Sequence, residues 1–133
     1  MNEQEQQEII LRLSLYEQQM QQLQEQMQAI ENGILELQSL CLGLNELEGK
    51  KDEEIMAHVG RGIFARAKLL EDDLLVDVGN KNFVKKTIPE TQKIIEMQVK
   101  KFEAIKKEIN SALEKLAEEM QKIVDGVQEQ EKD

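Results

Sequence analysis

Apolar and polar residues alternate with a period of two through the middle of the chain, from about residue 54 to residue 87. In one run Ile63, Ala65 and Ala67 alternate with Arg66 and Lys68, which is the spacing of a β-strand and not of a helix. The run at 74–78 repeats the pattern, 83–87 is a third β-rich run with paired lysines, and the short stretch 55–59 is a candidate fourth strand. The pattern therefore predicts four short strands.

Turn-forming residues separate these runs. GRG occupies 60–62, EDD 71–73 and GNKN 79–82, and they supply the Gly, Asn and Asp that tight connections need. Two successive β-hairpins are therefore expected. Because such small hairpins are marginally stable alone and the chain has no further layer to cover them, we expect their apolar faces to meet other subunits. The residues expected to carry this assembly are Ile63, Ala65, Leu74, Val76 and Val78.

The first arm of the chain has the heptad pattern of a coiled coil, with seam residues at spacings of four and three. The seam consists of Ile9, Leu13, Tyr16, Met20, Leu23, Met27, Ile30, Ile34, Leu37, Cys41 and Leu44. Many glutamines lie off this seam, but the unbroken register favours a solvated coiled-coil face over a low-complexity tract. Gly33, also off the seam, is expected to cost about 1 kcal/mol of helix propensity. Gly49 is a suitable C-terminal stop.

The second arm begins at TIPE, where Thr87 and Glu90 have the spacing of a capping box and Pro89 falls in the first turn of a helix. Its seam consists of Ile95, Val99, Phe102, Lys106, Ile109, Leu113, Leu116, Met120, Ile123 and Val127. Lys106 is the polar exception, and the neighbouring Ile105 is expected to compensate for it.

These elements define the expected fold class: mainly α, a long antiparallel two-helix coiled coil with two β-hairpins inserted between the helices. The expected bounds within a single domain of residues 1–133 are a helix at about 4–49, hairpins at about 54–87 and a helix at about 88–129. Arms of equal length can run side by side, so residues 9–16 are expected to meet residues 116–127.

Composition narrows the class of protein further. The chain has no Trp, one Tyr and three Phe, which is too few aromatic residues for an ordinary globular core. A third of the residues are charged and there is one proline, as in long helices. The formal net charge of −10 argues against a basic face that would bind nucleic acid or an anionic membrane. Because the chain has a single cysteine, no intrachain disulfide is possible. The sequence has no apparent signal peptide or bilayer-spanning run, so we expect a cytoplasmic location.

Candidate chemistry is sparse. The single histidine, His58, lies in a predicted strand and is expected to be structural, and Cys41 occupies a seam position that suits a small buried hydrophobe. GRG lacks the Lys-Ser or Lys-Thr of a phosphate-binding loop, and no residues have metal-ligand spacing. We therefore expect no catalytic residue, metal or cofactor, and an enzyme is the least favoured class.

The segment GRGIFARAKLLEDDLLVDVGNKNFVKKT, leading directly into a capped helix, resembles alpha-type subunits of the prefoldin family, of the archaeal kind. The most specific parts are the G-x-G-x-F-x-x-A-x-L run at 60–69, LLVDVG and FVKKT. The resemblance implies a hexamer of two alpha-type and four beta-type subunits joined through a β-barrel base. It also implies capture of non-native proteins without ATP and their delivery to a group II chaperonin.

Client contacts are expected at the helix ends far from the hairpins, where Ile10, Leu11 and Val124 add apolar groups outside the seam. A plainer explanation is that these residues complete the coiled coil or are ordinary exposed residues. With the resemblance, the expected client-binding residues are Ile9, Ile10, Leu11, Leu13, Ile123, Val124 and Val127. The alternative function is a structural coiled-coil scaffold or tether without client binding, which would explain the heptads but not the two hairpins.

Overall fold

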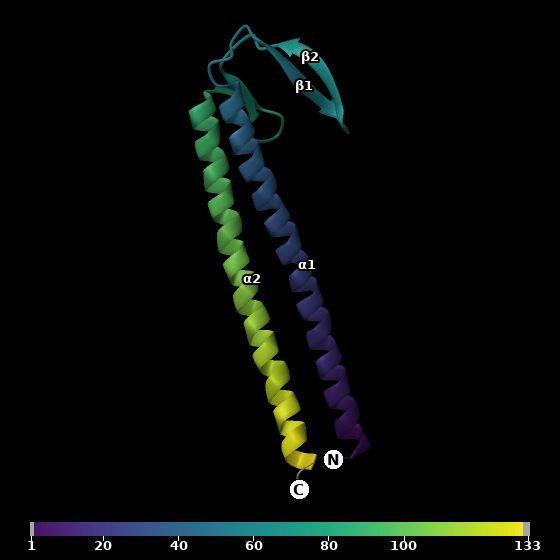
Figure 1. Cartoon of the computed structure of the whole chain (residues 1–133). Helices are drawn as coiled ribbons and strands as arrows, with labels where there is room; N and C mark the ends of the chain where they lie inside the picture. Colours follow the sequence, from purple (N-terminus) through teal and green to yellow (C-terminus); the bar gives the residue numbers. More distant parts are fainter. Residues whose placement is uncertain (1, 132–133) are drawn as a thin grey trace. The chain divides into compact units, whose positions relative to one another are not determined.

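The computed structural model describes residues 2–131. Along the chain follow α1 (Glu3–Leu47), β1 (Glu54–Gly60), β2 (Ile63–Lys68), β3 (Leu74–Asp77), β4 (Phe83–Lys86) and α2 (Ile88–Glu131) (Figure 1). The predicted order of helix, two hairpins and helix is confirmed. Contacts within the chain divide it into two units. The first unit comprises Met1–Ile34 and Lys101–Asp133, and the second comprises Leu35–Lys100.

Local sequence signals explain where both helices begin and where α1 ends. Asn2 caps α1, because its Oδ1 accepts a hydrogen bond from the Glu5 backbone N–H at 2.8 Å. Helix α1 ends two residues before Gly49, whose φ of +75° is the left-handed conformation of a helix stop. At the start of α2 the Glu90 N–H donates to Thr87 Oγ1 at 3.2 Å, so the predicted N-cap is confirmed.

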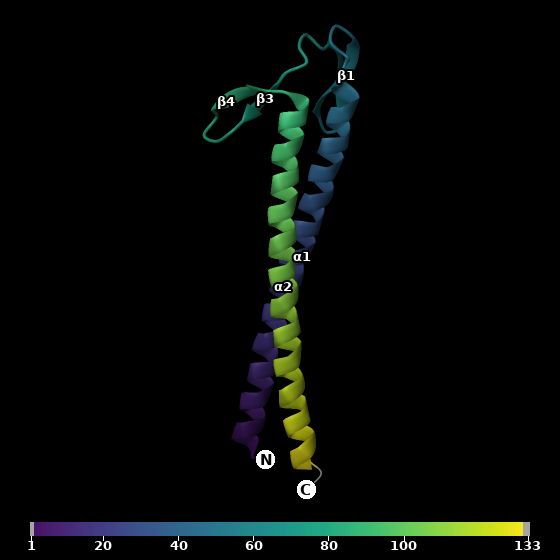
Figure 2. The same cartoon turned by 90° about the vertical axis from the view of Figure 1, so that its left-hand side faces the viewer.

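In the first unit the two helical segments run antiparallel side by side, and both ends of the described chain lie at the same end of this unit (Figures 1 and 2). All the predicted seam residues of this unit are buried or half-buried. Ile34 and Ile109 are the most covered, while the others stay partly open because one helix covers only one side of its partner. The predicted antiparallel pairing is therefore confirmed here.

Gly33 has a packing role that the sequence did not suggest. A Cβ atom added at this residue would lie 2.9 Å from Cε2 of Phe102, so the missing side chain makes room for the aromatic ring. The expectation that Gly33 only costs helix propensity was therefore incomplete. Sequence reasoning failed because the partner of Gly33 lies on the other helix.

Lys106, the polar seam residue, is accommodated by an acidic partner. Its Nζ lies 3.6 Å from Glu31 Oε1 on the facing segment. Ile105, which was expected to compensate, is exposed. An ion pair across the helices, and not a neighbouring apolar side chain, therefore satisfies this position.

A second polar pair joins the helices within the second unit. Gln92 Nε2 donates to Asn45 Oδ1 at 2.6 Å and to the backbone oxygen of Cys41 at 3.2 Å. Asn45 and Glu31 are fourteen residues apart on α1, as are Gln92 and Lys106 on α2. Both polar pairs therefore specify the same antiparallel register, because a slip of either helix would separate the polar partners.

The apolar core of the second unit lies where the helices meet the hairpins. Leu44, Ile88 and Ile95 form it, and Leu74 at the start of β3 packs against it. Cys41, at its predicted seam position, is half-buried and also packs there. The core therefore ties the second hairpin to the helix ends.

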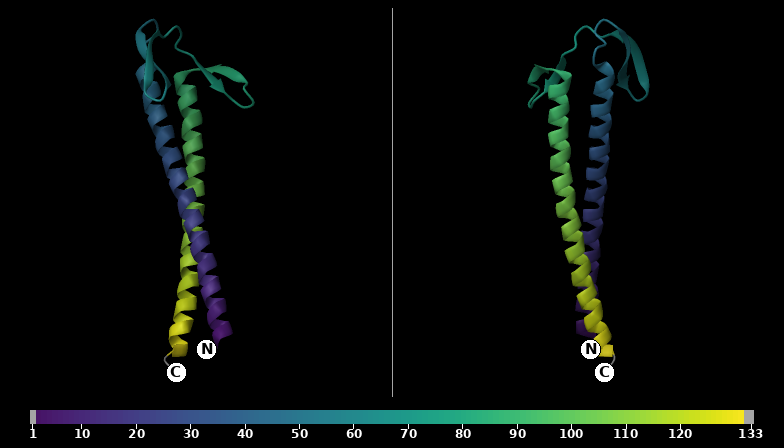
Figure 3. Two further views of the ribbon diagram at one scale, coloured as in Figure 1. Left: turned by 90° about the vertical axis from the view of Figure 1, so that its right-hand side faces the viewer. Right: turned by 60° about the vertical axis from the view of Figure 1, so that its left-hand side comes forward.

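The four predicted strands form two separate antiparallel hairpins, β1–β2 and β3–β4, which extend in different directions (Figures 2 and 3). In the first hairpin Ala57 pairs with Ala65, and in the second Val76 pairs with Val84. Both turns have two central residues with positive φ, Arg61 and Gly62 in one and Asn80 and Lys81 in the other. Positive φ at both central residues is typical of two-residue hairpin turns, whose backbone twist matches the right-handed twist of the flanking strands.

Candidate functional site

The expected client-binding residues lie at the free end of the helix pair in the first unit. Ile9 on α1 and Ile123 and Val127 on α2 line one shallow groove of about 310 Å³. The rest of its lining consists of Arg12, Glu119, Lys122, Gly126 and Gln130. The structure thus brings residues from the two ends of the sequence together, and the expected meeting of residues 9–16 with 116–127 is confirmed.

Other apolar residues lie in the same turns of the two helices but off this groove, which we call the tip groove. Ile10 and Leu11 are 67% and 61% exposed, and Val124 is 36% exposed, whereas Leu13 is half-buried in the seam. Leu15, which was not among the expected residues, is also exposed. Its signal was the same as for Ile10 and Leu11, an apolar residue off the heptad seam. The end of the first unit therefore presents apolar groups both in the groove and at helix positions outside it.

The segments that carry the tip groove are acidic, although in its own lining Arg12 and Lys122 outnumber Glu119. A second pocket, of about 200 Å³, shares Ile9, Arg12 and Gln130 with it and adds Glu5 and Glu8. Lys122 Nζ lies 3.7 Å from Glu119 Oε1, so this lysine has an acidic neighbour. Residues 1–20 and 114–133 contain eleven Asp and Glu against four Lys and Arg. The groove thus lies on helix segments with an excess of negative charge.

The expected assembly residues lie on the two hairpins, with different surroundings. Ala57, Ala65 and Ile63 belong to one apolar face of β1–β2, since paired and alternate residues share a side of a hairpin. Ile63 is 64% exposed, and Val59, in the irregular pairing next to the turn, is 69% exposed. The part of this face next to the turn is therefore open to contact, whereas Ile55, Ala57 and Ala67 are half-buried.

The second hairpin departs from the expectation that its apolar face lacks cover within the chain. Leu74 packs on the core of its own unit and Val76 is half-buried, whereas Val78 is exposed. Val84, which pairs with Val76, is 42% exposed, and further exposed apolar groups lie on the other side of this hairpin, at Leu75 and Phe83. In the sequence, the adjacent residues Leu74 and Leu75 break the alternation of apolar and polar residues. This break indicated that both sides of the hairpin carry apolar side chains.

Lys85 and Glu71 form an exposed ion pair beside this hairpin. Lys85 Nζ lies 3.0 Å from Glu71 Oε2, and it donates a hydrogen bond to Oε1 at 3.3 Å. This hydrogen bond, together with the charge of Glu71, raises the pKa of Lys85. The lysine therefore stays charged throughout the neutral range, and the pair links the loop before β3 to β4.

Other candidate groups show no arrangement for chemistry. His58 packs its ring against Phe64, with centroids 5.1 Å apart, in line with the structural role expected. Among the residues that the structure describes, no three His, Cys, Asp or Glu side chains are grouped to hold a metal ion. Within the same residues, no helix is both long and apolar enough to cross a membrane.

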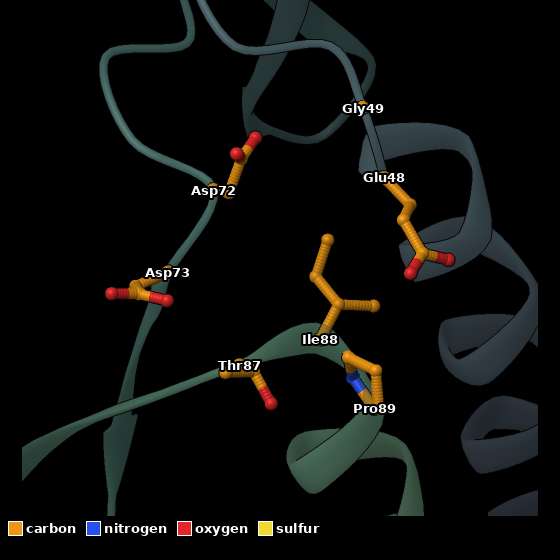
Figure 4. Close-up of a pocket in the computed structure, with 7 residues that line it drawn as sticks. All are labelled: Glu48, Gly49, Asp72, Asp73, Thr87, Ile88 and Pro89. Atoms are coloured by element: carbon orange, nitrogen blue, oxygen red, sulfur yellow. The ribbon is translucent and has the colours of Figure 1, made fainter.

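A pocket of about 320 Å³ lies beside the core of the second unit, and Glu48, Asp72 and Asp73 contribute carboxylates to its lining. Ile88 projects between Glu48 and Asp72 (Figure 4). Only 3% of its surface is exposed. The pocket is thus the acidic rim of a core residue, without a grouping of donors that would bind a cation.

Comparison with known proteins identifies the family. The model of the family described as prefoldin subunit matches residues 16–133. The chain belongs to the prefoldin family. It is similar to prefoldin subunit alpha of Methanobrevibacter smithii, with 29% identity over 119 residues, 89% of this chain and 77% of the relative. Prefoldin subunit alpha of Methanoregula boonei is 30% identical over 105 residues, 78% of this chain and 69% of that protein. The resemblance to archaeal alpha subunits is thereby confirmed.

The fold has a counterpart among solved prefoldin structures. A chain of filamentous prefoldin from Methanocaldococcus jannaschii, solved by cryo-electron microscopy, superposes with a TM-score of 0.75 and covers 85% of this chain and 95% of its own length. Sequence identity is 19%, so this likeness concerns the fold. The expected fold class of two long helices with hairpins between them is confirmed.

Proposed function

We propose that this prefoldin chain is the alpha-type subunit of an ATP-independent chaperone, which captures non-native proteins at the ends of its helices. The observation that carries the proposal is the apolar surface at this end of the first unit: Ile9, Ile123 and Val127 line the tip groove, and Ile10 and Leu11 are exposed at neighbouring positions of α1. Unfolded proteins present scattered apolar side chains. Small apolar patches on several arms can hold them reversibly, because weak contacts add up through multivalency.

The hairpins are the assembly elements in this proposal. The open apolar face at Val59 and Ile63 gives an exposed sheet that a neighbouring subunit can cover. The family resemblance supplies the partners: four beta-type subunits with two alpha-type subunits, joined in a β-barrel base. A group II chaperonin would receive the client, and the cytoplasm is the proposed compartment.

Nucleotide, metal and catalysis have no part in this function. The family is one of chaperones. The proposal therefore requires that holding activity be the same with and without ATP, and that a chelator leave it intact.

The test uses the complex formed with beta-type subunits from the same organism. A denatured enzyme is diluted into buffer without nucleotide, and its aggregation is followed by light scattering. We expect near-stoichiometric complex to suppress aggregation, and added group II chaperonin with ATP to restore enzyme activity. Suppression that needs ATP, or no suppression by a complex of the correct mass, would contradict the proposal.

A structural scaffold is the second candidate. The observation in its favour is that the similar solved chain comes from a filament. If this chain alone forms filaments by electron microscopy and the mixture with beta-type subunits does not hold denatured enzyme, the scaffold is the better assignment.

A further inference from the structure

The tip groove has a size and shape that suit single side chains of an extended client. At about 310 Å³ it lies at the lower end of the range of ligand-binding pockets, about 300–1,000 Å³. Its apolar groups come from α1 and α2, and polar side chains surround them. Such a groove can take one or two apolar side chains, while the flanking client residues lie over the polar rim.

Charges on this rim decide which flanking residues are favoured. In the groove's own lining Arg12 and Lys122 outnumber Glu119, so the acidic excess lies at its edge, where Glu5 and Glu8 line the adjoining pocket. The segments on both sides carry eleven acidic against four basic residues. Salt at physiological concentration screens interactions of exposed charges beyond about 8 Å. These acids therefore act only on nearby groups, which are the client residues that flank a side chain held in the groove.

We infer that the tip groove selects non-native segments in which an apolar side chain is flanked by Lys or Arg, and disfavours segments flanked by Asp or Glu. This inference rests on the proposed function, because it names the class of client for the same site. Charge complementarity at a rim acts mainly on specificity and association rate. The apolar groups hold the client, and the acidic rim decides which client is held.

Arg12 makes the inference testable in both directions. It is the one basic residue among the first 49 residues of the chain, and it lines both pockets. Its charge opposes the acidic rim, so Arg12→Gln should strengthen the preference for basic flanks. Glu5→Gln with Glu8→Gln should weaken the preference.

The experiment measures binding of labelled unstructured peptides to the complex with beta-type subunits, by fluorescence anisotropy. Each peptide carries three Leu residues in a Gly-Ser background, with Lys, Ser or Asp on both sides of every Leu. A fourth peptide carries the Lys residues without Leu. Exposed charge pairs change affinity by roughly 1.5- to 5-fold each. We therefore expect the Lys-flanked peptide to bind about tenfold more tightly than the Asp-flanked one at 50 mM NaCl.

Salt and variants complete the test. At 0.5 M NaCl the difference should fall below about twofold, and Glu5→Gln with Glu8→Gln should reduce it several-fold at 50 mM. The matched control is Glu36→Gln with Glu46→Gln, exposed acids on α1 in the second unit, which should leave the difference unchanged.

The outcomes separate this inference from the proposed function. If the three Leu peptides bind with equal affinity, the inference is overturned while client capture stays intact. The same holds if the Lys peptide without Leu binds as tightly as the Lys-flanked Leu peptide. If no peptide binds and aggregation is not suppressed, the proposed function fails as well. If no peptide binds but the complex suppresses aggregation, client capture stands and the tip groove does not select clients by single flanked side chains.

Discussion

The two units of this prefoldin chain both expose large apolar side chains but differ in charge. The first unit has fifteen acidic against seven basic residues, and the second has twelve against ten. A nearly balanced surface with apolar faces suits lasting association, because no strong repulsion opposes close contact. A strongly negative surface keeps like copies apart and leaves its apolar groups available to other molecules. The difference suggests that one unit holds subunits and the other holds clients.

The largest expected effect concerns assembly through the hairpins. Val59→Asp with Ile63→Asp should disperse the complex with beta-type subunits, because two carboxylates would be buried in an apolar interface at a cost of several kcal/mol each. Both side chains are exposed in the single chain, so helix content by circular dichroism should not change. Native mass spectrometry gives the result.

The control for this prediction is Leu15→Asp, an exposed apolar position in the first unit. That variant should assemble normally. If the hairpin variant forms the full complex at micromolar concentration, or if Leu15→Asp disperses it, the division of roles between the two units is wrong.

A smaller effect is expected at two glycines of α1. Gly33→Ala should destabilise the complex by about 1–3 kcal/mol, since the new Cβ would lie 2.9 Å from the Phe102 ring and overpacking outweighs the gain in helix propensity. Gly43 has no atom within 4 Å of a Cβ, so Gly43→Ala should stabilise by about 0.5–1 kcal/mol. Thermal unfolding of both variants measures the difference, and equal shifts would exclude a packing role for Gly33.

The polar pairs between the helices should affect register more than stability. Gln92→Leu with Lys106→Leu replaces polar seam residues by apolar ones, which is often neutral or stabilising. Alternative registers then become accessible. Spin labels at Gln38 and Gln98, both exposed in the second unit, should give one narrow distance distribution with the native pairs. A distribution equally narrow in the double variant would show that the apolar seam alone sets the register.

The fold was largely predictable from the sequence because its signals are local. The heptad seams, the cap at Thr87 and the turn residues at 60–62 and 79–82 each determine the backbone nearby. Contacts between segments distant in sequence were not predictable in the same way. Three such contacts depend on which residues of the other segment come opposite. They are the packing of Phe102 against Gly33, the ion pair of Lys106 with Glu31, and the packing of Leu74 on the core.

The position of the tip groove could be predicted from the sequence, but the composition of its rim could not. Apolar residues off the seam, such as Ile10 and Leu11, marked the region, and equal arm lengths placed 9–16 near 116–127. Its rim could not be derived, because Arg12 and Lys122 come to the same groove only through the register of the helix pair.

The smallest expected effect concerns pH. The pKa of Lys85 is raised by its hydrogen bond to Glu71, so the stabilisation by this pair is fully present below the ordinary lysine pKa of 10.5 and is lost as pH rises through the raised value. Between pH 6 and 9, Glu71→Gln and the native chain should therefore show the same small, constant difference in melting temperature. A difference that changes within this range would contradict the assignment.

The central claim, that clients are held by the apolar groups at the acidic helix ends, is tested most directly by a matched pair of variants. Ile10→Ser with Leu11→Ser removes two exposed side chains from the first unit, and Leu40→Ser with Leu42→Ser removes two, 52% and 68% exposed, from the same helix in the second unit. The stoichiometry needed to suppress aggregation of a denatured enzyme is measured for complexes of equal mass. We predict that only the first variant requires several-fold more complex; an unchanged requirement for it, or an equal increase for both variants, would contradict the claim.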